Sequence, residues 1–236
     1  METLACNLSI GRARRETLNR RQYLVAPMTM IRQGVLRGSS GPLFYPIDEM
    51  RKSVGAWNRT PIIVNHPPDG MSAQRSRILK QWGIGFVMRS RIANLDLKAD
   101  GWFDIERTQR VEPSLYDCLI NGRPFELSTG LYTRNIPAEP GASYGGRLYN
   151  YIATNYRPDH LAVLPRMTGA CSLRDGCGVL VNRADPKPKT PGDDMSREDH
   201  GRMARHHQAL ATKHALAYVG IEPDEDVESD DEDNEG

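Results

Sequence analysis

The sequence predicts an α+β domain rich in β-strands, and three observations lead to this class. First, residues 23–182 alternate short apolar runs with Gly, Pro and Asn, which is typical of strands joined by tight turns. Second, two segments within that range have the apolar spacing of an amphipathic helix. Third, 39% hydrophobic and 26% charged residues suit a globular chain that is long enough to bury a core.

The expected strands are short apolar runs bounded by turn residues. They lie at residues 23–27, 34–38, 61–64, 83–91, 101–105, 126–134, 148–155 and 160–164. One helix is expected at 46–56, where Ile47, Met50 and Val54 fall on one face. A second is expected at 113–121, which ends in Asn-Gly, a common helix-stop signal.

Composition divides the chain into five parts. These are a basic N-terminal arm (1–22), the main domain (23–182), a Pro- and charge-rich linker (183–195), a helix with a thin apolar stripe (196–220) and an acidic tail (221–236). The linker is expected to be extended and the tail disordered, because neither has enough apolar residues to bury. The helix would be marginal alone, so we expect it to dock on a partner surface.

The net charge of +1 conceals a strong asymmetry. Residues 221–236 contain ten Asp or Glu and no Lys or Arg, so residues 1–220 carry 31 basic against 20 acidic side chains. A basic body suits nucleic acid or acidic proteins, including the chain's own tail. Nucleic acid is disfavoured because no basic stripe interleaved with aromatic residues is present.

The sequence predicts neither a membrane span nor a cofactor. No run of about 18 apolar residues occurs, and the N-terminus lacks the apolar core of a secretory signal, which indicates a cytoplasmic protein. The cysteines are not arranged in CxxC pairs, so we expect reduced structural thiols and no metal. They are Cys6, Cys118, Cys171 and Cys177.

Two positions carry candidate chemistry. His66 follows the buried strand at 61–64 and precedes a proline, a place where an imidazole is half-exposed and can act as a base. Ser128 lies in an apolar, strand-like run and is followed by Gly130, so the backbone can hold a nucleophile rigidly beside free N–H groups. Either residue taken alone is more often structural than catalytic.

A third motif places His160 at the mouth of a hydrophobic strand. The sequence order Asn65-His66, Leu127-Ser128-Thr129-Gly130 and His160-Leu161-Ala162-Val163, followed by Arg166 through Gly169, resembles the herpesvirus assemblin proteases and the phage prohead (capsid-maturation) proteases. The opening at 23–27, a hairpin turn at 101–103 and Pro158-Asp159-His160 look similar to the phage group. The resemblance covers about residues 20–180, although relatives have Gly-Arg-Ala-Gly where this chain has Arg-Met-Thr-Gly at 166–169.

The resemblance implies a fold and a set of roles. The fold would be a closed or partly closed β-barrel with surrounding helices, and residues 23–182 would form the protease domain. Ser128 would be the nucleophile, His66 its general base and His160 the residue that orients His66. Arg166 and Thr129 would contribute to the oxyanion hole.

Asp159 is the alternative third member of the catalytic group. Side chains alternate along a strand, so Asp159 and His160 are expected on opposite faces, and only one of them can point at His66. His160 is favoured, because Leu161 and Val163 would then lie on the core face.

The resemblance also implies a biological setting. The chain would be a serine endopeptidase that cleaves scaffold and capsid proteins during phage procapsid maturation. Its partners would be the major capsid protein and the scaffold protein, inside assembling procapsids in the host cytoplasm. Homo-oligomers are left open. The alternative is a non-catalytic capsid assembly or scaffolding protein with the same fold, which residues 196–236 would suit equally well.

Overall fold

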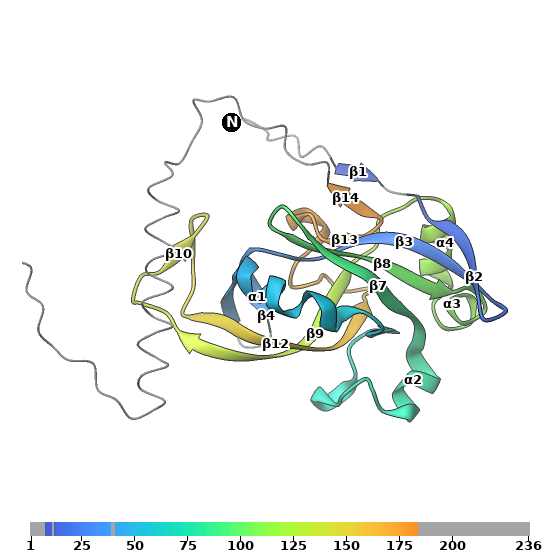
Figure 1. Cartoon of the computed structure of the whole chain (residues 1–236), viewed down its shortest axis with the longest axis horizontal. Coiled ribbons are helices and arrows are strands. Elements are labelled where there is room, and N and C mark those ends of the chain that lie inside the picture. Colours follow the sequence, from blue (N-terminus) through green and yellow to red (C-terminus); the bar gives the residue numbers. More distant parts are fainter. Residues whose placement is uncertain (1–7, 11, 39–40, 184–236) are drawn as a thin grey trace, which may run out of the picture. The chain divides into compact units, whose positions relative to one another are not determined.

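Long curved strands dominate the computed structural model of the chain (Figure 1). The structure describes residues 8–10, 12–38 and 41–183, all of which belong to one unit, Met1–Asp185. The expected helix and acidic tail, and the linker apart from Arg183, lie outside the described residues.

The main sheet is mixed and has ten strands. In order they are β13 (Gly178–Val179), β3 (Arg21–Arg32), β8 (Asp96–Asp104), β7 (Gly83–Ala93), β6 (Pro61–Val64), β12 (Tyr151–Val163), β5 (Gly41–Tyr45) and β4 (Gly34–Gly38), with β2 (Arg14–Leu18) on β3 and β9 (Leu127–Pro137) on β12. Strand β12 runs parallel to β5 and β6, and the other pairs are antiparallel. Two small pairs are separate: β1 (Leu8–Ile10) with β14 (Val181–Arg183), and β10 (Ser143–Tyr144) with β11 (Arg147–Leu148).

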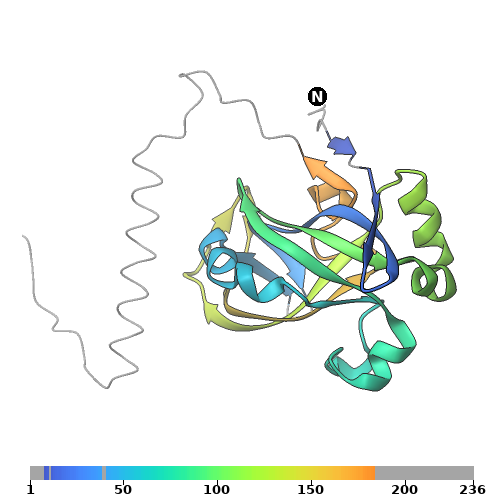
Figure 2. The ribbon, with the colours of Figure 1, turned by 45° about the vertical axis from the view of Figure 1, so that its right-hand side comes forward.

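The helices are short and lie outside the sheet (Figure 2). They are α1 (Ile47–Ser53), α2 (Ser76–Trp82), α3 (Ile105–Val111) and α4 (Pro113–Ile120), with 3-10 turns η1 (Val54–Trp57), η2 (Pro68–Gly70) and η3 (Leu173–Asp175). None of the helices within the described ranges is long and apolar enough to cross a membrane.

The α+β class is confirmed, but the closed form of the barrel is not found. The sheet stays open, because β4 and β13, the two ends of the strand order, do not pair with each other. An isolated bridge joins Phe125, just before β9, to Val179 of β13. The fold is therefore a general α+β arrangement built on a large mixed sheet.

Several expected elements have other boundaries. The strands expected at 148–155 and 160–164 are one strand, β12, which accommodates Pro158 at an irregular register. Residues 101–103 are not a turn, because they lie within β8 between β3 and β7. Part of the segment expected as an arm, Arg14–Leu18, pairs with β3 through a turn in which Asn19 and Arg20 have positive φ. Two residues with positive φ match the strand twist in such a hairpin.

The expectation of four reduced thiols is wrong for two of them. Cys171 and Cys177 form a disulfide across the η3 turn. Ser172 and Asp175 form a capping box on this turn, and Gly176 leaves it with a φ of 91°, so the turn itself brings the cysteines together. Cys118 is free.

Candidate active site

His66 lies just beyond the end of β6. Asn65 has a φ of 60°, a conformation that Asn tolerates better than most residues, and its N–H donates to Val163 O at 2.9 Å. This turn carries the chain from β6 alongside the neighbouring parallel strand β12. His66 therefore lies beside the C-terminal end of β12, the part of the strand that contains His160.

A hydrogen-bonded chain joins three of the predicted site residues. His66 Nδ1 lies 2.7 Å from His160 Nε2, and His160 Nδ1 lies 2.8 Å from Asp159 Oδ2. Asp159 and His160 are buried, whereas His66 is exposed. His160, the favoured third member, is thus the residue that contacts His66, and Asp159 lies behind it.

The reasoning from strand alternation is wrong at this point because β12 is bulged. Pro158 pairs with Leu131 of β9 and His160 pairs with Gly130, so two steps along β12 correspond to one step along β9. The extra residue is Asp159. A bulge breaks the alternation of side chains and redirects one of them, and here it lets Asp159 and His160 meet.

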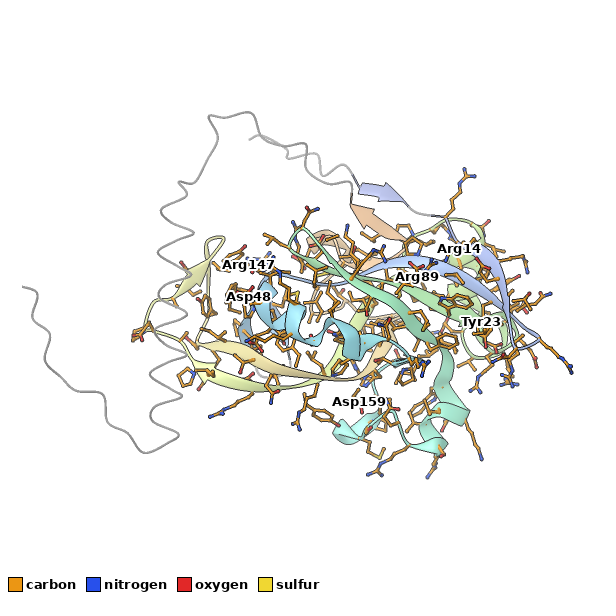
Figure 3. All side chains as sticks on the ribbon, in the orientation of Figure 1. Arg14, Tyr23, Asp48, Arg89, Arg147 and Asp159 are labelled. Atoms are coloured by element: carbon orange, nitrogen blue, oxygen red, sulfur yellow. A yellow bond between two sulfur atoms is a disulfide. The ribbon has the colours of Figure 1, made fainter. Side chains whose placement is uncertain are left out.

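Asp159 also holds the segment before α2. Its carboxylate accepts hydrogen bonds from the Ser72 hydroxyl and from the Ala73 N–H, the latter at 2.8 Å, while Gln74 Nε2 donates to its backbone O at 2.7 Å. Figure 3 labels Asp159 near this segment. The loop 72–74 therefore fixes the Asp159 carboxylate on one side, and His160 contacts the carboxylate on the other.

The charges determine which nitrogen carries each proton. Burial raises the pKa of Asp159, but hydrogen bonds from Ser72, Ala73 and His160 outweigh it and lower the pKa below its ordinary value, so the carboxylate is ionised. Burial lowers the pKa of His160, which keeps that ring neutral. His160 must then donate from Nδ1 to Asp159 and accept at Nε2 from His66 Nδ1.

His66 is left with an unprotonated Nε2. Although the residue as a whole is exposed, the protein around the ring desolvates it, and this effect, with a smaller contribution from His160, lowers the pKa of His66 to about 4. A neutral imidazole whose Nδ1 donates has its lone pair on Nε2. This is the protonation state that a general base requires.

Ser128 faces the same hollow from β9. It pairs with Ala162, two residues from the pair of Gly130 with His160, so Ser128 and His160 lie on the same face of the sheet. Ser128, His66, Asp159 and His160 all line a pocket of about 620 Å³. No hydrogen bond joins Ser128 to His66 among the described residues.

Gly130 leaves the space that the His160 ring occupies. A Cβ built at position 130 would lie 2.0 Å from His160 Cε1 and 2.3 Å from Nε2. Real Cβ atoms do not approach ring atoms so closely, so only glycine fits opposite His160. The sequence motif predicts that Gly130 leaves backbone N–H groups free for an oxyanion. In the structure, glycine is needed at this position because a larger residue would collide with the His160 ring.

The far side of the pocket is formed by the chain that follows β12. Glu126 holds this segment, since its two carboxylate oxygens accept the N–H groups of Gly169 and Leu173, each at 3.2 Å. Thr129 lines the pocket, as do Met167 and Thr168. Arg166 is exposed and is not among the described lining residues, so the structure does not bring it to Ser128.

Sequence reasoning missed the loop 72–74 and the carboxylate of Glu126. Both make hydrogen bonds with segments distant in sequence, and no local pattern marks such contacts. No cluster of three or more His, Cys, Asp or Glu arranged for a metal occurs in the part of the chain that the structure describes.

These features define an α+β fold with an Asp–His–His chain, buried at Asp159 and His160, that ends in a serine-lined pocket. No protein-family model matches the chain, and neither a curated protein nor a solved structure matches it.

Proposed function

We propose that the protein is a serine endopeptidase in which Ser128 is the nucleophile and His66 the general base. The observation that carries the proposal is the hydrogen-bonded chain Asp159–His160–His66, which leaves the lone pair of His66 Nε2 free beside the pocket that Ser128 lines. A surface histidine needs no such chain behind it, whereas a base that must gain a positive charge benefits from one.

In this mechanism His66 Nε2 takes the proton of the Ser128 hydroxyl as Oγ attacks the scissile carbonyl carbon. The tetrahedral intermediate collapses when the C–N bond breaks, and His66 gives its proton to the leaving amine. Water then hydrolyses the acyl-enzyme by the same steps in reverse order. Attack requires Ser128 Oγ to come within about 2.6–3.2 Å of His66 Nε2, a contact that substrate binding would have to complete.

Asp159 gives this site a property that two histidines alone would lack. A neutral His160 stabilises a His66 imidazolium weakly, whereas the Asp159 carboxylate behind it supplies a full negative charge. Thr129 and the N–H groups of Met167 and Thr168, which line the pocket, are the candidates for the oxyanion hole, in place of Arg166.

The resemblance of the sequence motifs supplies the proposed setting. In that setting the chain would have an assemblin-like fold, and it would cut scaffold protein and the major capsid protein inside an assembling phage procapsid. The structure itself contains an open mixed sheet.

A fluorophosphonate probe on the full chain tests the enzyme proposal. We expect covalent labelling that maps to the peptide containing Ser128, and loss of labelling in Ser128→Ala and in His66→Ala. Ser114→Ala is a matched control on an exposed helical serine and should label like the native chain. Labelling that persists in Ser128→Ala would refute the assignment of the nucleophile.

The second candidate is a non-catalytic assembly protein, and the lack of a hydrogen bond between Ser128 and His66 favours it. The two functions can be distinguished by following the processing of capsid proteins in an infected cell in which the chain carries Ser128→Ala. Unchanged processing of capsid proteins would leave assembly as the function, and a block in processing would support the peptidase.

A further inference from the structure

A second hollow of about 700 Å³ adjoins the candidate active site. We call it the arginine groove, because Arg37, Arg147 and Arg174 line it. It shares Arg37, Thr168 and Ala170 with the pocket that contains Ser128. A chain bound across both hollows would therefore run without a break from one to the other.

The cations of the groove are largely unneutralised. All three arginines are exposed, and neither the Arg37 nor the Arg174 side chain makes a hydrogen bond or ion pair with another described residue. Arg147 donates from Nη1 to Val35 O and contacts Asp175 through Nη2, each at 3.4 Å. Figure 3 labels Arg147 on the short β10–β11 pair, well apart from Asp159.

Asp175 does not cancel this charge. It is the one carboxylate among the described residues of the groove, and Ser172 bonds its Oδ2 through both its hydroxyl and its N–H. Burial raises the pKa of Asp175, but these bonds and Arg147 lower it, so it stays ionised as part of the η3 turn. Three guanidinium groups against one satisfied carboxylate leave a net positive hollow.

We propose that the arginine groove binds a carboxylate-rich segment of the polypeptide substrate, beside the bond that is cut. Guanidinium groups bind carboxylates through paired hydrogen bonds, and a flexible acidic segment can meet several of them at once. The identity of the ligand as a substrate rests on the proposed peptidase function, whereas binding of an acidic segment does not.

Acidic peptide fits the groove better than nucleic acid does. Single-stranded nucleic acid is held by aromatic side chains on which bases stack, and the described lining has none. Its uncharged residues are small or aliphatic, such as Val35, Pro42 and Leu148. These suit the backbone and short side chains of an extended peptide.

The test is fluorescence anisotropy with the full chain carrying Ser128→Ala, which prevents cleavage of the probe. The probe is a fluorescein-labelled peptide of alternating Glu and Ser, with a Gln and Ser peptide of equal length as its partner. We expect the Glu peptide to bind about tenfold more tightly than the Gln peptide at low salt, and to weaken as salt rises.

Added to Ser128→Ala, the double change Arg37→Gln and Arg174→Gln should weaken binding of the Glu peptide about tenfold or more. The matched control makes the same change to Gln at Arg77 and Arg110, two exposed arginines outside the groove. It should change the affinity for the Glu peptide less than twofold. Arg174→Gln alone guards against a folding defect, because the exposed Arg174 side chain makes no hydrogen bond or ion pair with a described residue, and it should weaken binding severalfold at an unchanged melting temperature.

Equal losses in the groove and control variants would overturn the proposal, since they would reflect overall charge alone. So would a single-stranded oligonucleotide that displaces the Glu peptide and depends on the same arginines. If the Glu peptide binds at the groove but Ser128 resists the fluorophosphonate, the groove stands and the peptidase falls. If Ser128 reacts and the Glu peptide does not bind, the peptidase proposal stands and the groove proposal falls.

Discussion

The imidazole of His160 occupies the place where a side chain at position 130 would lie. Gly130→Ala would put a Cβ 2.0 Å from the ring, so the ring must turn away from His66 or β9 must move. We expect a loss of stability of about 1–3 kcal/mol, as for other overpacked sites. The rate of peptide cleavage should fall by at least about tenfold, because His66 loses its partner.

Gly55→Ala is the matched control for this substitution. Gly55 lies in the η1 turn, has an ordinary φ and has no atom within 4 Å of a built Cβ. Thermal melts and peptide cleavage measured on both variants should separate them. If Gly130→Ala behaved like Gly55→Ala, His160 would not be held where the mechanism needs it.

The pH dependence of the rate should follow the imidazole of His66. Its ordinary pKa near 6.5 would put the rise of activity around neutral pH, but burial lowers the pKa to about 4. The base is active when neutral, so kcat/KM should rise through about pH 4 and stay level above it. A steady-state profile from about pH 3 to pH 8 checks this.

Acid also acts on the fold, which sets the control for that profile. The pKa values of His66 and His160 are lowered in the folded chain, so the unfolded chain binds more protons and stability falls as the pH drops below about 6.5. Circular dichroism at each pH must show a folded chain. A rise centred at 6.5 or above in a folded protein would count against His66, with its lowered pKa, as the base.

At the scale of elements, the bulge in β12 decides the composition of the site. It makes Asp159 a partner of His160, so Asp159→Asn should lower the rate by about a hundredfold or more, and His160→Ala by a similar amount. Both variants should be measured with the same peptide substrate, alongside their melting temperatures.

Ser72→Ala distinguishes the two roles of Asp159. It removes the hydroxyl that binds the carboxylate but keeps the bonds from Ala73 and His160. We expect a loss of stability of about 1 kcal/mol and a small effect on the rate. A rate loss in Ser72→Ala as large as that in Asp159→Asn would mean that the loop 72–74, rather than the charge, matters for catalysis.

At the scale of the whole molecule, the described unit contains every residue of the candidate site. A chain that ends at Asp185 should therefore still cleave a peptide substrate, and in vivo it should fail to enter procapsids if the remaining residues direct placement. An end at Val181 would be a worse choice, because it removes Asn182 and Arg183 of β14, which pair with β1. Loss of peptide cleavage in the chain that ends at Asp185 would show that residues 186–236 belong to the catalytic unit.

Much of the fold follows from local patterns. Strands β4 and β6 have the bounds that their apolar runs predicted, and α4 differs from its predicted helix by one residue. Helices α2 and α3 were missed, because seven residues are too few for helical periodicity to stand out from noise. The open edge of the sheet was also missed, since closure depends on how distant strands pair.

The sequence by itself determined which residues could do chemistry and the order in which they occur. Ser128 and His66 were candidates from their neighbours, and His160 and Asp159 entered through the resemblance of the motifs to the assemblin and prohead proteases. Only the tertiary structure decided how they combine, because the register of β12 is set jointly by β6 on one side and β9 on the other. That shared register leaves one extra residue in β12, and the bulge it forms turns two rival residues into successive members of one hydrogen-bonded chain.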